Sequence, residues 1–535
     1  MWPGALWVVT ALALGAGPGV PLDPLDDWKN EKDREHDSPL SEFRLINYFF
    51  TRLSYTNLLG DPSGLKGVAL GPMGLPSGSS VLVGPGSESF FVEQRWIPVL
   101  EYSPWFVDDL ATFRAQLEID FMWGYAANAL QQNQGGGFNA DQVNLQTKNV
   151  NVSLYPTRKP RELTIVIGTQ ALYDGVDDPA RTGLLDIVRG GYKLAFVGSD
   201  ATGISLYSGL LGKTRLALMP LGAAQPDRAT LNDSRLKFAW LGMLDEAVEI
   251  MPGTTVGASL WWLHDETKGA AYAYEGLVAS GPSSRGLAGF TGTPRLNIDA
   301  AIGNVYFAGA HFQHNLQFNT GPFAASGFLM VTGGQYLNTR ANSTANQNVS
   351  MLGAAGNLEL MFNYGRSAND QLTLETMITT GDSNLDDSRY TGVFTLNFYG
   401  LPGAVWFNHK TMLLFPFTST VNNYTGGVTD ISNQGYGLTS AILSGAYDLV
   451  PNVLNLKLGG AVATANADPA VTSSGVQPGR FMGVEVNAEL RWHIRYLMTI
   501  GLHGAYMFRG SFYDGNDRVT TNPFALFTTF TWYAF

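Results

Sequence analysis

Phe113-Arg-Ala-Gln-Leu-Glu-Ile-Asp-Phe-Met-Trp123 is the stretch that decides the fold of this chain. Its odd-numbered residues are apolar, whereas the even-numbered residues from Arg114 to Asp120 are polar or charged. Successive side chains of a β-strand point to opposite faces, so the stretch predicts a strand with one apolar and one ionisable face. The segment 484–495 repeats the pattern, with apolar residues alternating with Glu485, Asn487, Glu489, Arg491, His493 and Arg495.

Weaker alternation continues over residues 45–535, which contain no helical block. Only 15% of all residues are charged, against about 25% in soluble domains, and the mean hydropathy is −0.01. Low charge without long apolar runs suits a surface on which every second residue meets lipid. No blade-length repeat indicates a soluble propeller. The chain is therefore predicted to be all-β, a single large transmembrane antiparallel β-barrel.

The connections between the expected strands have two lengths. Residues 366–370 and 448–452 suggest short turns, whereas 61–89, 126–141 and 269–294 suggest long loops. Outer-membrane barrels have short periplasmic turns and long outer loops. At roughly 9–11 residues per strand, residues 45–535 accommodate about 16–18 strands. A barrel of that size is expected to enclose an aqueous channel.

The two segments before the barrel differ in composition. Residues 1–20 are apolar and rich in Ala and Gly, which predicts a signal peptide. Residues 21–44 are charged and too polar to bury a core, so we expect a mobile periplasmic N-terminal extension. The chain has no Cys, which excludes disulfides, thiolate metal sites and a lipid-attachment cysteine. Its net charge of −12 argues against a nucleic-acid-binding surface.

The last twelve residues are Phe524-Ala-Leu-Phe-Thr-Thr-Phe-Thr-Trp-Tyr-Ala-Phe535. Aromatic alternation that stops on Phe resembles the closing strand of bacterial outer-membrane β-barrels. The resemblance implies the outer membrane of a Gram-negative bacterium and contact with its lipids and lipopolysaccharide. It also implies recognition of this strand by the barrel-assembly machinery.

Two internal stretches resemble the alginate-export family of outer-membrane barrels. In the first, Gly168, Gln170, Tyr173 and Arg189 match the family's strand end, its Tyr-Gly turn and its following Arg segment. In the second, Gly381 and Asp382 match the start of the family's acidic loop. The resemblance implies a monomeric barrel of about 18 strands that passes a polyuronate along basic pore residues.

Ionisable residues on the expected strands are assigned to the pore. The reason is that Lys or Arg facing lipid at the bilayer midplane costs roughly 2–4 kcal/mol. The pore-lining and candidate substrate-binding residues are Arg114, Glu118, Asp120, Lys237, Glu359, Glu375, Lys457, Glu485, Glu489, Arg491, His493 and Arg495. Both signs of charge occur, which indicates either a transverse field across the lumen or internally compensated salt bridges.

Metal binding and catalysis have weaker signals. Two acidic loops offer carboxylates that suit Ca²⁺, although Asp also simply favours turns; their residues are Asp174, Asp177, Asp178, Asp382, Asp386 and Asp387. No other cofactor is expected. Glu485, Glu489, Arg491 and His493 share a strand face, but no nucleophile-elbow, zinc-protease or Walker spacing accompanies them. We therefore predict no enzyme activity.

The leading functional hypothesis is an outer-membrane channel for a hydrophilic solute, an exopolysaccharide such as an alginate-like polyuronate on its way out. A periplasmic export partner would then supply the polymer. The first alternative is a substrate-selective uptake porin for small acids or sugars. The second is a structural barrel that sheathes a partner. Pore width and selectivity separate the uptake porin from the leading hypothesis, whereas a sheathing barrel should come with a cytochrome partner.

Overall fold

The computed structural model describes most of the chain after the first 42 residues. The described residues are 43–60, 81–104, 110–124, 140–159, 162–182, 187, 189–210, 212–224, 237–266, 296–365, 367, 369–397, 411–415, 430–495 and 497–534. The expected signal peptide, nearly all of the expected extension and the terminal Phe535 lie outside these ranges. Within them, no helix is long and apolar enough to span a membrane.

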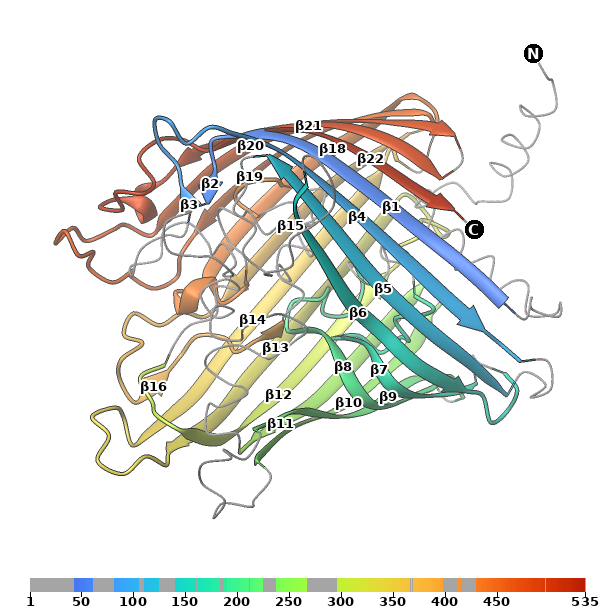
Figure 1. The fold of residues 1–535 in the computed structure, drawn as a ribbon, viewed down its shortest axis with the longest axis horizontal. Helices are drawn as coiled ribbons and strands as arrows, with labels where there is room; N and C mark the ends of the chain where they lie inside the picture. Colours follow the sequence, from blue (N-terminus) through green and yellow to red (C-terminus); the bar gives the residue numbers. More distant parts are fainter. Residues whose placement is uncertain are drawn as a thin grey trace.

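Eighteen antiparallel strands close into a barrel, because β1 pairs with both β4 and β22 (Figure 1). Each strand in the ring pairs with the next, so no edge is left open to lipid. In chain order they are β1 (Phe43–Thr56), β4 (Ser89–Tyr102), β5 (Ala111–Gly124), β6 (Ala140–Leu154), β7 (Leu163–Tyr173), β8 (Val197–Ser208), β9 (Lys213–Ala224), β10 (Lys237–Met251), β11 (Thr254–Asp265), β12 (Ala301–His314), β13 (Phe323–Asn338), β14 (Asn348–Asn363), β15 (Gln371–Thr379), β18 (Leu438–Val450), β19 (Leu454–Thr464), β20 (Phe481–Arg495), β21 (Met498–Arg509) and β22 (Phe524–Ala534).

Four very short strands lie outside this ring. β2 (Leu59–Gly60) and β3 (Val81–Leu82) form a separate pair. β16 (Arg389–Tyr390) pairs in parallel with β14, and β17 (Leu396–Asn397) pairs in parallel with β8. The predicted all-β barrel of about 16–18 strands is confirmed.

The two ends of the barrel differ. Connections such as 209–212, 252–253 and 451–453 lie at one end, together with the start of β1 and the end of β22 (Figure 1). Connections such as 266–300 and 380–437 lie at the other. Short turns and both termini mark the periplasmic end of an outer-membrane barrel. We call these the short-turn end and the long-loop end.

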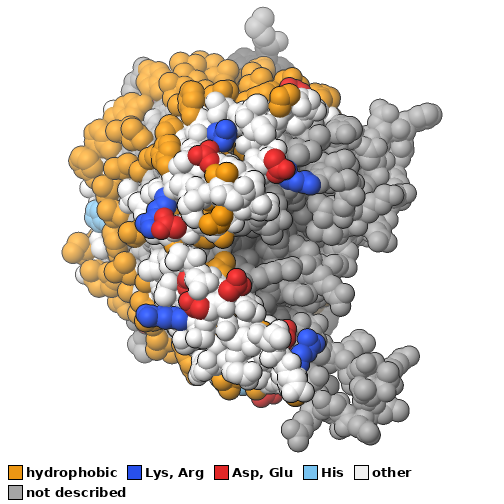
Figure 2. Space-filling view, turned by 90° about the vertical axis from the view of Figure 1, so that its left-hand side faces the viewer, with side chains coloured by type: hydrophobic (Ala, Val, Ile, Leu, Met, Phe, Trp, Pro, Cys, Tyr) orange, Lys and Arg blue, Asp and Glu red, His pale blue; other side chains and the backbone are white. Residues whose placement is uncertain are grey.

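Side chains alternate between lipid and lumen as the pattern predicts. In β20, Val486 and Trp492 are exposed, whereas Glu485 and Glu489 are buried. Leu329 in β13 is 70% exposed, as expected for a lipid-facing residue. Seen from the long-loop end, hydrophobic side chains gather on the outside of the described wall and charged ones lie on the mouth (Figure 2).

The lumen differs from the open aqueous space that barrel size predicts. Inward residues of β10 to β13, among them Met243, Trp261 and Phe307, are buried in one hydrophobic core. Tyr192 and Phe196, from the connection between β7 and β8, belong to the same core. Because long connections fold inward, apolar side chains fill part of the space that water would occupy.

The lipid-facing assignment predicts how stability depends on depth. Leu329→Lys, near the middle of β13, should lower the free energy of unfolding by about 2–4 kcal/mol. Leu337→Lys, at the end of the same strand, should lower it by about 0–1 kcal/mol. Guanidinium unfolding in phospholipid vesicles measures both values. Equal losses would contradict the assignment.

Candidate pore constriction and mouth cavity

The connection between β7 and β8, residues 174–196, is folded into the lumen by a buried carboxylate. Asp174 accepts hydrogen bonds from the backbone N–H groups of Leu194 at 2.8 Å, Phe196 at 2.6 Å and Val197 at 3.3 Å. Burial raises the pKa of Asp174 to about 6, although these bonds and nearby Arg215 oppose the rise. The carboxylate thus ties the end of the connection to its beginning.

A buried ion cluster joins this connection to the opposite wall. The Lys193 ammonium lies 2.7 Å from Glu359 of β14 and 3.1 Å from Glu375 of β15, and all three side chains are fully buried. Lys193 and Leu194 both have φ of 58°, a left-handed conformation that costs about 1–2 kcal/mol per residue without glycine. The cluster and the Asp174 bonds together hold this strained backbone in place.

Tyr192 fills the space in front of the wall. Its ring packs edge-on against Trp261, with the ring centroids 5.3 Å apart. A Cβ at position 309 would lie 2.7 Å from the Tyr192 hydroxyl oxygen, so Gly309 leaves room for that hydroxyl. The sequence of β12 is therefore shaped to receive the connection.

The second inward connection runs from β15 to β18, over residues 380–437. Tyr390 pairs with Met351 of β14, whereas Leu396 pairs with Val197 of β8, so residues 390–396 cross the lumen between these walls. Further along, Asp430 accepts hydrogen bonds from Thr395 Oγ1 at 2.7 Å and from Ser432 N–H at 2.8 Å. Burial raises the pKa of Asp430.

Glu485 of β20 holds a further part of the connection between β15 and β18 in place. Its carboxylate accepts the N–H groups of Met412 at 2.8 Å, Leu413 at 3.0 Å and Leu414 at 2.7 Å. Met412, Leu413 and Leu414 are buried in the luminal core. A buried carboxylate again satisfies several backbone donors of an inward segment, as Asp174 does for its own connection.

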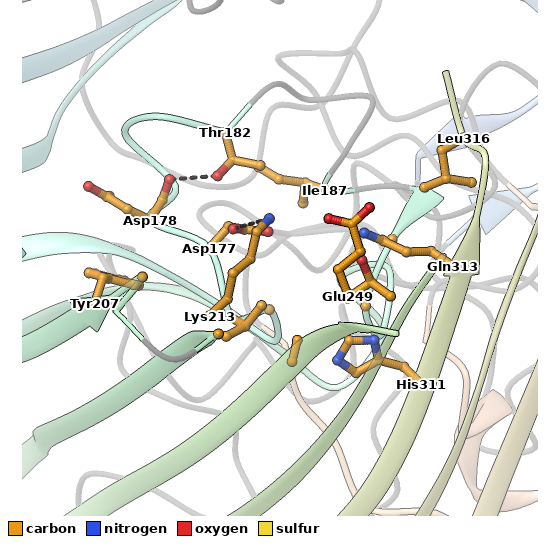
Figure 3. A pocket seen from close by; sticks show the side chains of 18 of the residues that line it. Asp177, Asp178, Thr182, Ile187, Tyr207, Lys213, Glu249, His311, Gln313 and Leu316 are labelled. Atoms are coloured by element: carbon orange, nitrogen blue, oxygen red, sulfur yellow. Dashed lines mark hydrogen bonds and ion pairs between the residues drawn. The ribbon is translucent and has the colours of Figure 1, made fainter. Parts of the chain in front are cut away.

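A cavity of about 760 Å³ lies at the short-turn end, below the connection between β7 and β8 (Figure 3). Strand register arranges its wall in rows. One row contains Lys213, Ala247, Gly257 and His311 across β9 to β12. The next row toward the short-turn end contains Glu249, Thr255 and Gln313.

The opposite side of the cavity is formed by residues that follow β7. Asp177 pairs with Lys213 at 2.7 Å, and Asp178 lies 3.6 Å from Arg181 (Figure 3 draws the first pair). One row deeper, Arg215 donates to Asp245 at 2.7 Å, and Asp245 also accepts from Ser259 and Trp261. Beyond that row the wall is apolar, so the polar cavity ends where the luminal core begins.

The predicted pore residues fall into compensated groups. Arg114 pairs with Glu101 and Glu118 with Arg95, while Glu489 contacts Lys457, Arg491 and His503. Glu359 and Glu375 bind Lys193, Glu485 holds residues 412–414, and His493 contacts Thr499. Arg495 is exposed at a strand end. The side chains of Asp120 and Lys237 lie outside the described part. A role of this set in solute binding stays a prediction.

The acidic loops do not form a metal cluster in the described part of the chain, where no group of three or more candidate ligands occurs. Asp174 is engaged by three backbone N–H groups. Asp382 accepts from the N–H of Thr391 and of Asn384, and Asp387 from that of Arg389. These contacts are those of turn-forming acids.

Sequence reasoning missed Lys193, Arg215 and Asp245 as residues that organise the lumen. Lys193 is an isolated charge among uncharged neighbours, which is a signal for an internal ion pair, whereas Arg215 lies two residues after Lys213 and Asp245 directly precedes Glu246. Their partners lie 30 to 182 residues away in the chain, so local alternation does not reveal them.

No family model matches the chain, and no curated protein does. Solved structures that match include Acinetobacter baumannii OccAB4, with 9% identity, 92% of this chain and 98% of that chain covered, and a TM-score of 0.45. The outer membrane protein OprD from Pseudomonas aeruginosa matches with 11% identity, coverage of 92% and 93%, and a TM-score of 0.44. Pseudomonas aeruginosa OpdK, solved with vanillate, matches with 12% identity, coverage of 92% and 98%, and a TM-score of 0.44. At such identities and TM-scores the likeness carries no argument about the role of this chain, and the closed antiparallel β-barrel rests on the strand pairing described above.

The expected relationship to alginate-export barrels is wrong, since the solved structures that match are OccAB4, OprD and OpdK. Export of an exopolysaccharide, which rested on that resemblance, is corrected with it. Two of the motif residues, Gly168 and Gln170, instead make contacts within the β-sheet of the barrel. Gly168 has φ of 125°, and a Cβ there would lie 2.5 Å from the Val150 carbonyl oxygen. Gln170 donates to the carbonyls of Val166 and Gly203.

The ion cluster predicts a large effect of removing its cation. Lys193→Met leaves two carboxylates buried without their ammonium and should lower the free energy of unfolding by about 3–5 kcal/mol. Adding Glu359→Gln and Glu375→Gln should recover most of the loss, because the buried charges are then gone. Guanidinium unfolding in lipid vesicles compares the variants. A single variant as stable as the parent would contradict the cluster's role.

Proposed function

We propose that this protein is a substrate-selective porin that lets a small hydrophilic solute cross the outer membrane into the periplasm. The observation that carries the proposal is the pair of inward connections, fixed to the wall by buried carboxylates and an ion cluster. They leave a polar cavity at the short-turn end, beneath an apolar core. Such a lumen favours passage of solutes of limited size.

A comparison of this lumen with the route that a polysaccharide would need supports the proposal of a small solute. A polysaccharide must keep many sugar units in the lumen at once and therefore needs a wide, continuously polar route. Here residues 390–396 cross the lumen, and Met412, Leu413 and Leu414 are buried inside it. The described interior therefore favours a small solute that meets a narrow, selective passage.

A passive channel also accounts for the charged residues without a catalytic step. Asp174, Glu485 and Glu489 are buried carboxylates that bind backbone N–H groups or cationic side chains. Asp174 and Glu485 each hold three N–H groups, and Glu489 lies between cations. These are the contacts of a scaffold that shapes a pore, which is why we propose a channel and not an enzyme.

Permeation through proteoliposomes tests the proposal. Osmotic swelling should be rapid with a monosaccharide and absent with a polysaccharide in the bath. Equal entry of both would contradict a narrow selective passage, and entry of neither would contradict a channel for small solutes.

The contact of Glu485 with residues 412–414 predicts a wider pore when it is removed. Glu485→Ala should raise single-channel conductance in a planar bilayer, because the inward segment loses three hydrogen bonds. Asp468→Ala is the control, since this exposed carboxylate pairs with Arg480 outside the lumen. A Glu485 variant that conducts no better than the control would count against the proposed constriction.

A further inference from the structure

We propose that the cavity at the short-turn end binds a solute through its ammonium or guanidinium group, with Glu249 as the anionic partner and Gln313 and His311 beside it. The inference rests on the proposed function and names the chemical class of the solute. It also makes a cation, and not a simple acid, the expected small solute.

Strand register creates the hollow that such a solute needs. Lys213 and His311 belong to one row of inward residues, but the two positions between them are Ala247 and Gly257. A Cβ at Gly257 would lie 2.2 Å from His311 Nε2, so the imidazole lies across that glycine. Gly257 thus makes room for the imidazole, and the small side chain of Ala247 leaves a recess in the cavity wall between Lys213 and His311.

The row nearer the short-turn end supplies the side chains that would bind the solute. Glu249 and Gln313 lie on either side of Thr255 in the register of β10, β11 and β12. Figure 3 shows Glu249 and Gln313 close together above His311, with Lys213 and Asp177 across the cavity. A carboxylate, an amide and an imidazole therefore converge on one volume.

The charges around the cavity are not equally available. Lys213 is paired with Asp177, and Arg181 lies beside Asp178, so each of these cations has an acidic neighbour in the lining. Asp174 is occupied by three backbone N–H groups. Glu249 is exposed to the cavity and accepts one bond, from Gly253 N–H at 2.8 Å, with no ion pair among the described residues. The charge in the cavity without an ion-pair partner among the described residues is therefore the negative charge of Glu249, and a solute would meet this charge.

His311 provides a second, independent sign of a ligand. It lines the cavity and is only 7% exposed, yet its Nδ1 is buried and has no hydrogen-bond partner. Buried polar atoms are normally satisfied by protein, water or ligand. A solute that places a hydroxyl or N–H group beside the ring would satisfy this nitrogen while its cationic group meets Glu249.

The size of the cavity points to a small organic cation. A volume of about 760 Å³ falls within the roughly 300–1,000 Å³ that organic ligands occupy in proteins. A metal ion would need several carboxylate or imidazole ligands together, and no such group occurs in the described part of the chain. An ammonium or guanidinium group needs only one carboxylate and a few neutral acceptors.

The test compares two probes of similar size and opposite charge, ethanolammonium and glycolate, in planar bilayers that hold the full-length protein. Their permeability ratio follows from the reversal potential in a concentration gradient. We expect ethanolammonium to be preferred. Glu249→Gln should reduce that preference about two- to fivefold, as expected for loss of one half-exposed ion pair. Glu249 is exposed, so the substitution leaves the fold intact.

Two further variants test whether the effect is specific to the cavity. Asp468→Asn removes the same charge at the long-loop end and should leave the preference unchanged. Gln313→Leu should weaken ethanolammonium permeation while leaving the ratio of K⁺ to Cl⁻ permeability as it is. Open current with no preference for ethanolammonium, or equal effects of Glu249→Gln and Asp468→Asn, would overturn the site but not the channel. Absence of current with every small solute would overturn both.

Discussion

A buried carboxylate that accepts hydrogen bonds from several backbone N–H groups is the interaction on which this structure depends. A closed barrel of eighteen strands satisfies its own backbone but leaves a wide lumen. Segments that enter the lumen leave the strand ladder, so their donors need other acceptors. Asp174 and Glu485 supply those acceptors, three donors each. The narrowing of the pore follows from these two side chains.

Polarity changes in steps along the wall formed by β9 to β12. The row nearest the short-turn end contains Glu249 and Gln313, and a row deeper in the lumen contains the Arg215–Asp245 pair. Beyond it come Met243, Trp261 and Phe307, which meet Tyr192 and Phe196 in the luminal core. A solute moving toward the short-turn end therefore meets buried apolar surface first and water-exposed charge last.

Alternation predicted the strands and their faces, because a period of two residues follows directly from backbone geometry. The lengths of the connections predicted the two kinds of end. Glu485 and Glu489 illustrate this, since both are buried where the pattern placed them on the polar face. The inward connections could not be predicted in the same way. Lys193 meets Glu359 across 166 residues of chain, and no local pattern records such a pairing. Short motifs misled for a related reason, since Gly168 is required by the local strand geometry, with φ of 125° and the Val150 carbonyl oxygen close by.

Amide hydrogen exchange of the protein in lipid vesicles tests the central claim, that residues 192–197 and 411–415 are fixed inside the lumen. Buried, hydrogen-bonded amides exchange slowly, whereas amides of exposed turns exchange fast. The account predicts that both segments exchange nearly as slowly as β8, which follows the first segment, and β20, which holds the second through Glu485. Exchange as fast as that of the exposed turn at 451–453 would contradict it, because the lumen would then be open and the constriction absent.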